Sequence, residues 1–398
     1  IDLLEKDELK KLTEELRTIY SEIEKGSFAI EDGVEDVHSQ VEILLTERLG
    51  DIGKKIHSGR SRNDQVLVDL KLYMRSQIEG TVEQMTACFS KFIELSNTHK
   101  DVLLPGYTHL QVAMPSSFGL WFGAYAESLL DDLELLLAAY KVVNKNPLGS
   151  AAGYGSSFPL DRTLTTNLLG FGALNYNVVY AQLSRGKTEK TVSMAIASIA
   201  STLSRMAMDT CLYMNQNFGF MTFPDELTTG SSIMPHKKNP DVFELVRGKC
   251  NALQALPNQI AMMTTNLPSG YHREMQLIKE QFFPAFQTIN DCLEMMAFMF
   301  DNATVKKEIV EDSKYDYLFS VEEVNRHVLN GTPFRDAYKL VGDSINQDNF
   351  SPVKEVNHTH EGSIGNLCND KLTASFKALE DQFNFPAVHS KVNALLGK

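Results

Sequence analysis

The chain has 398 residues, of which 43% are hydrophobic and 22% are charged, and its net charge is −13. This composition is ordinary for a soluble globular protein, and the length allows one to three domains. A nucleic-acid-binding protein needs a basic face, so the acidic balance argues against that class. An anionic substrate stays compatible, because local basic groups can outweigh a distant acidic surface.

The longest uncharged stretches, Leu110–Ala126 and Thr191–Ser204, are shorter than a membrane span, so we expect no membrane association. The five cysteines are scattered and form no CxxC pair, which argues against a zinc site or a disulfide framework and favours a reducing cytoplasm. The chain begins at Ile1 inside an apparent amphipathic helix, so we expect a further N-terminal piece before it.

In chain order, apolar residues at helical spacing predict five long helices, and strand signals are scarce. The expected helices are Asp64–Thr98, Pro115–Val143, Thr191–Asn215, Pro240–Asn266 and Arg273–Phe300. Pro115 fits a first helical turn, and Pro257 and Pro284 are expected to kink their helices. The predicted fold class is therefore all-α.

Helices of this length run roughly 35–50 Å, and their apolar surface exceeds what one compact chain buries. We therefore expect a long central bundle whose core continues into neighbouring subunits, with a monomeric bundle as the alternative. The expected domains are the rest of an N-terminal domain at 1–63, the central bundle at 64–301 and a small helical C-terminal domain at 302–398.

The loop GSSIMPHKKNP, residues 230–240, leads directly into a predicted helix. Asn239 fits an N-cap and Pro240 the first helical position. Free N–H groups at the helix start, together with Lys237 and Lys238, favour an anion at this point. A charged surface loop with a good cap is the simpler reading of the same residues.

Three further segments combine polar groups beside long helices. They are HSGRSRNDQV at His57–Val66, PGYTHLQVAMP at Pro105–Pro115 and YHREMQLIKE at Tyr271–Glu280. Each is weak alone, because a single loop histidine is more often structural and an arginine-rich segment usually faces solvent. Their combination with the loop is what makes them informative.

Together these segments resemble the argininosuccinate lyase branch of the fumarase/aspartase superfamily. GSSIMPHKKNP is similar to the signature GSSxMPxKxNP, and HSGRSRNDQ and GYTHLQ are similar to the branch's other blocks. The spacing of Tyr271, Gln276 and Lys279 fits the pattern Y-x4-Q-x2-K-E, and GTPFRDAY at Gly331–Tyr338 is similar to the C-terminal motif. The resemblance runs from about Glu35 to Gly342.

The resemblance implies a β-elimination that converts argininosuccinate to arginine and fumarate in arginine biosynthesis. A base removes the proton beside a carboxylate, an aci-carboxylate forms, and an acid protonates the leaving nitrogen. No metal or organic cofactor is expected. The resemblance also implies a homotetramer in which each active site is drawn from three chains.

Carried over by resemblance, Ser231 is the base, and Lys237 and Asn239 stabilise the intermediate. His109 is the general acid, and Glu244 orients it and raises its pKa. The expected substrate-binding residues are Arg62, Asn63, Thr108, Tyr271, Gln276 and Lys279.

Asp64 lies next to this substrate-binding block. The residues alone leave two interpretations open for it, a part in the block or a helix cap. If the helices alternate in direction, Asn63 and Tyr271 lie roughly 40 Å from His109 and Ser231, so residues of different chains must meet.

Two other functions fit the same residues. One is a superfamily lyase that acts on a different succinyl adduct, which its product would reveal. The other is a catalytically silent structural homologue such as a lens crystallin. Ser231, His109, Lys237 and Glu244 argue against the silent homologue, because a structural protein needs none of the four. His236 stands where glutamine is common in the branch, and we assign no role to Tyr180–Lys187.

Overall fold

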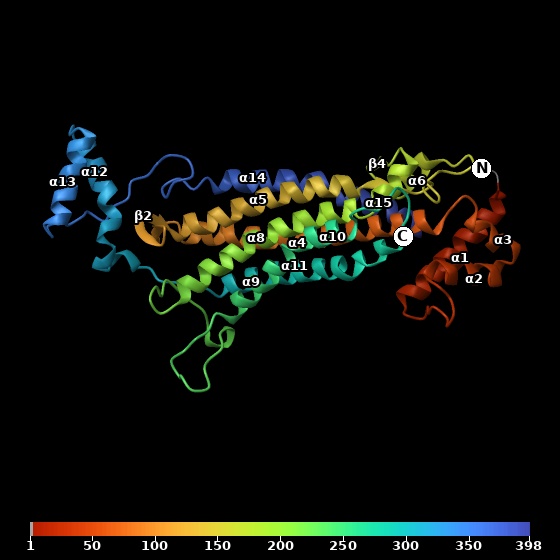
Figure 1. Cartoon of the computed structure of the whole chain (residues 1–398), viewed down its shortest axis with the longest axis horizontal. Helices are drawn as coiled ribbons and strands as arrows, with labels where there is room; N and C mark the ends of the chain where they lie inside the picture. The colour runs from red at the N-terminus through yellow and green to blue at the C-terminus, as the bar shows by residue number, and fades with distance from the viewer. Residues whose placement is uncertain (1–2) are drawn as a thin grey trace.

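The computed structural model describes residues 3–398 as an elongated bundle of long helices with smaller helical units at both ends (Figure 1). The four long helices are α4 (Arg62–Thr98), α5 (Phe118–Val143), α8 (Lys187–Met214) and α11 (Ile278–Asp301). With 37 residues, α4 is about 55 Å long and spans the bundle from end to end. The predicted all-α fold class is confirmed.

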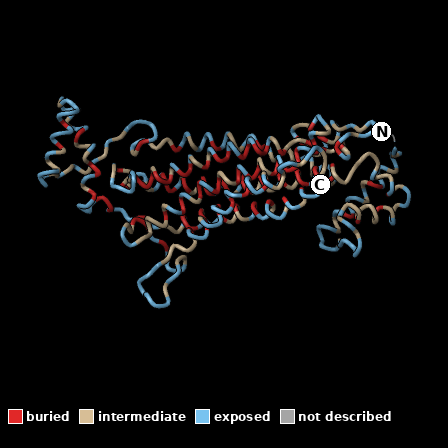
Figure 2. Tube along the Cα trace, in the orientation of Figure 1, coloured by how far each residue is buried: buried red, intermediate tan, exposed pale blue. Residues whose placement is uncertain are grey.

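The core of the bundle follows the apolar spacing of these helices. On α4, Met74, Ile78, Met85 and Phe92 are almost completely buried along one face. The buried positions lie along the inside of the long helices, while the outer turns are exposed (Figure 2). α8 contacts α5, α9, α10 and α11, which explains why its sequence is apolar on most sides.

The segment before α5 differs from the sequence expectation. Pro115 lies in strand β2 (Gln111–Ser117), which pairs with β1 (Leu103–Thr108) as an antiparallel hairpin. α5 begins only at Phe118, where the Ser117 side chain accepts the Leu120 N–H as an N-cap. The prediction of Pro115 in a first helical turn was therefore wrong.

The expected helix Pro240–Asn266 is two helices, α9 (Asp241–Leu253) and α10 (Leu256–Met263). Pro257 lies in the first turn of α10, so it marks a break between helices rather than a kink within one. Pro284 lies inside α11, as expected. The turn before α11 is a short 3₁₀ helix, η3 (Arg273–Gln276).

Two small units flank the bundle, each with its own apolar cluster. The N-terminal unit contains α1 (Lys6–Glu24), α2 (Val37–Leu49), α3 (Asp51–Lys54) and η1 (Lys55–His57), and it buries Leu12, Ile19 and Leu45. The C-terminal unit contains α12 (Ser320–Leu329) and α13 (Phe334–Asn346), and it buries Val324, Ala337 and Val341.

The end of the chain returns along the bundle as α14 (Asn369–Glu380) and α15 (Phe385–Leu396). Phe376 of α14 stacks on Phe89 of α4 with ring centroids 4.0 Å apart, and Phe383 packs on Tyr140 of α5. The division at 1–63, 64–301 and 302–398 stays a prediction, but these last thirty residues pack with the central bundle rather than with α12 and α13.

The connections contain only short elements. These are β3 (Lys145–Asn146), α6 (Arg162–Leu168), β4 (Ala173–Leu174), α7 (Val178–Leu183), β5 (Met221–Thr222), η2 (Asp225–Leu227), β6 (Thr304–Val305), η4 (Ile309–Glu311), η5 (Ser313–Phe319) and η6 (Asp381–Phe383). β3 pairs with β4 in parallel, and β5 pairs with β6 antiparallel. Among residues 3–398, no helix is long and apolar enough to cross a membrane.

Candidate active site

The candidate residues gather at the two ends of the bundle. Arg62 and Asn63 open α4 at one end, and the hairpin that carries Thr108 and His109 follows the other end of the same helix. The loop with Ser231 follows β5, which pairs with β6 just after α11 ends, so it also lies at the hairpin end. Figure 1 shows this separation, with β2 far from α6 and the chain termini.

At the first end, four of the predicted substrate-binding residues line one cavity of about 700 Å³: Arg62, Tyr271, Gln276 and Lys279. Gln276 donates through Nε2 to the Tyr271 hydroxyl at 2.7 Å. Burial, followed by the charge of Arg185, lowers the pKa of Lys279. These four residues thus offer two cations and two neutral polar groups to an anionic ligand.

The opening turn of α4 is fixed by Asp64 rather than left open for a ligand. Ser61 caps the helix, and the Asp64 carboxylate accepts the Ser61 N–H at 2.9 Å, which completes a capping box. The second oxygen of Asp64 accepts the N–H groups of Gly149 and Ala151. Asp64 is fully buried, so the capping interpretation of this residue is confirmed.

Arg62 is held by the N-terminal unit. Its Nε lies 3.0 Å from Asp36 Oδ2, and its other nitrogens donate to Gln65 and to Ser39. Asp36 is itself the N-cap of α2, accepting the Ser39 N–H. Arg62 therefore ties α2 to α4 beside the cavity, and its part in binding substrate stays a prediction.

His109 lies at the tip of the β1–β2 hairpin, next to Thr108, and both side chains are exposed. His109 and Leu110 are the two turn residues, with φ of 55° and 60°. Two consecutive positive φ angles define the type I′ turn, which matches the twist of a hairpin. Behind the tip, a cavity of about 700 Å³ is lined by His109, Tyr107, Trp121 and Asp209 among others.

Ser231 lies in an exposed loop and forms a tight local turn. Its Oγ accepts the N–H groups of Ile233 at 3.3 Å and Met234 at 3.1 Å. Two N–H donors aimed at one hydroxyl oxygen favour negative charge on that oxygen. Lys237 is exposed in the same loop, and Lys238 pairs with Asp225 at 2.8 Å.

The prediction that Asn239 caps the following helix was wrong. The N-cap of α9 is Pro240, and its side chain makes no capping hydrogen bond. Asn239 instead bridges back to Thr229, with its N–H donating to the Thr229 carbonyl at 2.8 Å. The Thr229 hydroxyl in turn donates to Asp241. This bridge closes the base of the loop and leaves the segment 230–238 projecting.

Within one chain, the expected partners do not meet. Among the residues that the structure describes, no hydrogen bond or ion pair joins His109 to Glu244, and Glu244 is exposed on α9. The cavity lined by Tyr271 does not include His109, and the cavity lined by His109 does not include Tyr271. The sequence placed Asn63 and Tyr271 at one end and His109 and Ser231 at the other, and the structure agrees.

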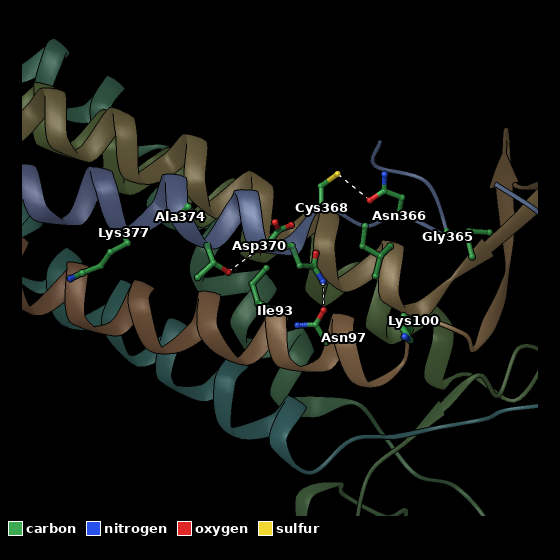
Figure 3. A pocket seen from close by; sticks show the side chains of 13 residues that line it. Ile93, Asn97, Lys100, Gly365, Asn366, Cys368, Asp370, Ala374 and Lys377 are labelled. Carbon is green, nitrogen blue, oxygen red and sulfur yellow. Dashed lines mark hydrogen bonds between the residues drawn. The ribbon is translucent and has the colours of Figure 1, made fainter. Parts of the chain in front are cut away.

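Another cavity, of about 820 Å³, lies between the end of α4 and the start of α14 (Figure 3). Lys100, Asp370 and Lys377 line it, and Asn369 donates to Ser96 and Asn97 beside it. It contains none of the predicted site residues. In the described part of the chain, no group of three or more His, Cys, Asp or Glu side chains is arranged to hold a metal ion.

Sequence reasoning missed several residues that line the Tyr271 cavity. Asp36 and His38 come from the N-terminal unit, and His38 Nε2 lies 2.8 Å from Asp69 of α4. The only available signal was the polar run Glu35–His38 before a predicted helix. That signal suggests a cap, and nothing in it indicates proximity to residues 271–279.

Comparison with known proteins adds to this geometry. A family model described as a lyase matches residues 1–254. A curated argininosuccinate lyase from Parabacteroides distasonis is 63% identical over 396 residues, which cover 100% of this chain and 89% of that protein. The argininosuccinate lyase of Phocaeicola vulgatus is 61% identical over 398 residues, with the same coverage.

The fold also matches solved structures. A crystal structure of EDDS lyase in complex with formate covers 96% of this chain and 86% of its own, with a TM-score of 0.78 and 21% identity. At that identity the match supports the helical fold alone. The fold and the family model together define a lyase built on a long helical bundle. The chain belongs to this lyase family, in its argininosuccinate lyase branch.

Proposed function

We propose that this protein is an argininosuccinate lyase that cleaves argininosuccinate to arginine and fumarate in arginine biosynthesis. The observation that carries the proposal is the 63% identity, across the whole chain, to an argininosuccinate lyase. The residues that the resemblance assigns to the chemistry lie at the two ends of the bundle, which supports the proposal.

Ser231 is the proposed base for the proton beside the substrate carboxylate. A free serine hydroxyl is too weak a base, so its alkoxide needs stabilisation. The N–H groups of Ile233 and Met234 already point at its Oγ. Lys237, in the same loop, supplies a positive charge for this oxygen and, with Asn239, for the aci-carboxylate intermediate.

His109 is the proposed acid for the departing guanidino nitrogen. An imidazole can both accept and donate a proton, so this side chain can protonate the leaving nitrogen directly or through a water molecule. The hairpin presents the ring at an exposed tip, where a ligand or another chain can reach it. Glu244 is the proposed carboxylate that orients it, and the two meet only if they come from different chains.

The proposed assembly is a homotetramer whose active sites combine both ends of the bundle. Asn63, Tyr271, Gln276 and Lys279 bind substrate carboxylates at one end, and His109 with Thr108 and Ser231 lie at the other, about 50 Å away by helix rise. One small substrate cannot span that distance. Antiparallel packing of neighbouring bundles brings opposite ends together, and exposed apolar residues such as Met194 and Phe298 lie on the outer bundle faces.

We place the enzyme in the cytoplasm. All five cysteines are free thiols, and three of them, Cys88, Cys250 and Cys292, are buried. Such a set is typical of a reducing compartment, since extracellular proteins tend to pair their cysteines. The substrate itself is the only partner that the proposed chemistry requires besides further copies of this chain.

The test follows fumarate by its ultraviolet absorbance while the purified protein is mixed separately with argininosuccinate, adenylosuccinate and aspartate. We expect rapid fumarate release from argininosuccinate alone. Release mainly from adenylosuccinate or aspartate identifies a different superfamily lyase. A folded protein that releases fumarate from none of the three is a silent homologue, and the proposal is then rejected.

A further inference from the structure

A buried charge network lies beneath the segment that carries Tyr271, Gln276 and Lys279. Arg185 precedes α8, and its Nε lies 3.1 Å from Glu189 Oε1, one helical turn further on. Both side chains are at most 5% exposed. The other Glu189 oxygen accepts the Gly186 N–H at 2.7 Å, so the carboxylate is fixed from two sides.

A third charge acts on this pair from the first third of α4. Lys71 of α4 is buried, donates to Asn175 Oδ1 at 3.0 Å, and its charge acts on the Glu189 carboxylate. The network thus holds two cations and one anion away from water. Buried ion pairs are often no better for stability than apolar residues of the same shape, so stability alone is a weak reason for this one.

Arg185 connects the network directly to the substrate-binding segment. Its NH2 group donates at 3.0 Å to the carbonyl of Met275, which lies in η3 between Tyr271 and Lys279. Gly186 follows with a φ of 78°, and a side chain there would come within 2.6 Å of Thr264. The start of α8 is therefore packed tightly against the turn that presents the binding residues.

The same turn sets the geometry of the cavity wall. Gln276 ends η3 and bonds to the Tyr271 hydroxyl, while Lys279 stands in the first turn of α11. Among residues 3–398, the bond from Arg185 to the Met275 carbonyl is the one side-chain hydrogen bond that joins the segment 271–279 to a distant part of the chain. Gln276 follows Met275 directly and is bonded to Tyr271. A displacement of Met275 would therefore also displace Gln276, Tyr271 and the nearby Lys279.

We propose that Arg185 is a positioning residue, which holds η3 so that Tyr271, Gln276 and Lys279 converge on a substrate carboxylate. It touches no substrate itself, because its side chain is enclosed by Glu189 and Met275. This inference rests on the proposed function for the identity of the ligand. The structural part of the proposal is that Arg185 anchors η3. This part does not depend on which succinyl adduct is bound.

The test compares Arg185→Lys with Arg75→Lys in the full-length protein. Arg75 is the matched control, since it is 4% exposed and donates to the backbone carbonyls of Leu169 and Gly170, away from η3. Lysine keeps the positive charge. Its ammonium group cannot replace the planar guanidinium, which donates to the Glu189 carboxylate and to the Met275 carbonyl at the same time. Amide hydrogen exchange of the segment 271–279 is measured first, followed by kcat and KM for argininosuccinate.

We expect Arg185→Lys to speed exchange in 271–279 about tenfold and to raise KM about tenfold with kcat little changed, as loss of one charged hydrogen bond predicts. Arg75→Lys should do neither. Unchanged exchange in Arg185→Lys, equal effects of both substitutions, or a loss in kcat alone overturns the proposal. If the wild-type protein releases no fumarate, the proposed function fails while the exchange data still decide on the anchoring.

A second variant keeps the proposal testable if Arg185→Lys fails to fold. Glu189→Gln keeps the side-chain shape and leaves Arg185 in place with a weaker partner. We expect faster exchange in 271–279 with a smaller rise in KM than in Arg185→Lys. Exchange that is unchanged in Glu189→Gln contradicts the network as the anchor of η3.

Discussion

His109 and Leu110 form the two central positions of the β1–β2 turn, and both have positive φ angles. For a non-glycine residue this conformation costs about 1–2 kcal/mol, and Leu110 has no local hydrogen bond from its side chain to offset it. The Leu110 side chain is 79% exposed in the single chain. A strained turn with an exposed leucine at its tip fits a hairpin that inserts into a neighbouring subunit.

Leu110→Asn tests that interpretation. Asparagine tolerates the left-handed conformation, so the turn and His109 stay in place while the apolar side chain is lost. We expect the proposed tetramer to dissociate at a protein concentration at least about tenfold higher, because burial of a leucine contributes about 1.5–3 kcal/mol. Sedimentation velocity over a dilution series measures this, and Leu329→Asn on α12, where the leucine is 88% exposed, is the control. Equal dissociation of the two variants contradicts the inserted hairpin.

Ser231→Ala removes the proposed base. Turnover of argininosuccinate should fall by at least about 10²–10⁴-fold, the usual contribution of a general base, with the oligomer intact. Ser232→Ala, at the exposed neighbouring position, should keep most of the wild-type rate. Appreciable activity in Ser231→Ala eliminates this residue as the base.

Lys279 sets the expected alkaline limit of the reaction. Burial and the charge of Arg185 lower its pKa from 10.5, and only its charged form attracts a carboxylate. As the pH rises, kcat/KM should therefore begin to fall at a lower pH than it would if Lys279 had the pKa of an ordinary lysine. Lys279→Arg stays charged throughout, so its profile should lose this decline although its overall rate is lower. An identical alkaline decline in the variant assigns the titration to another group.

The buried amine of Lys71 should make the free energy of unfolding depend on pH. Burial lowers its pKa from 10.5 to about 8, so between these values the unfolded chain binds more protons and the folded state gains stability as pH rises. The gain is about 3 kcal/mol at most, from 1.36 kcal/mol per pKa unit. In Lys71→Met this rise in stability should be missing. The free energy of unfolding of both proteins is measured from pH 8 to 10.5, and the difference between the two should change over this range. Parallel curves for the two proteins refute the assignment.

The parts of the fold that the sequence could predict depend on repeated apolar spacing. The stripe on α4 around Met74 and Phe92 and the apolar α8 follow that spacing, and the capping role of Asp64 follows from its place before the stripe. The β1–β2 hairpin was missed because its turn, His109-Leu110, lacks the glycine or asparagine that marks a type I′ turn.

The remaining errors concern contacts made at a distance. Asn239 looked like an N-cap from its neighbours, but its partner is Thr229, ten residues earlier in a closed loop. The network of Lys71, Arg185 and Glu189 joins segments more than a hundred residues apart, so no local pattern could indicate it. The grouping of candidate residues at two ends was predictable, because it follows from helix length together with alternating helix directions.

The most direct test of the central claim, an active site assembled from different chains, mixes two inactive variants. His109→Asn and Ser231→Ala proteins are purified, unfolded together in equal amounts and refolded, and fumarate release from argininosuccinate is measured. If each site takes its histidine and its serine from different subunits, random mixing restores roughly a quarter of the wild-type activity. Each variant refolded alone should stay inactive. A mixture that forms the full oligomer and shows no more activity than the separate variants contradicts an active site whose histidine and serine come from different subunits.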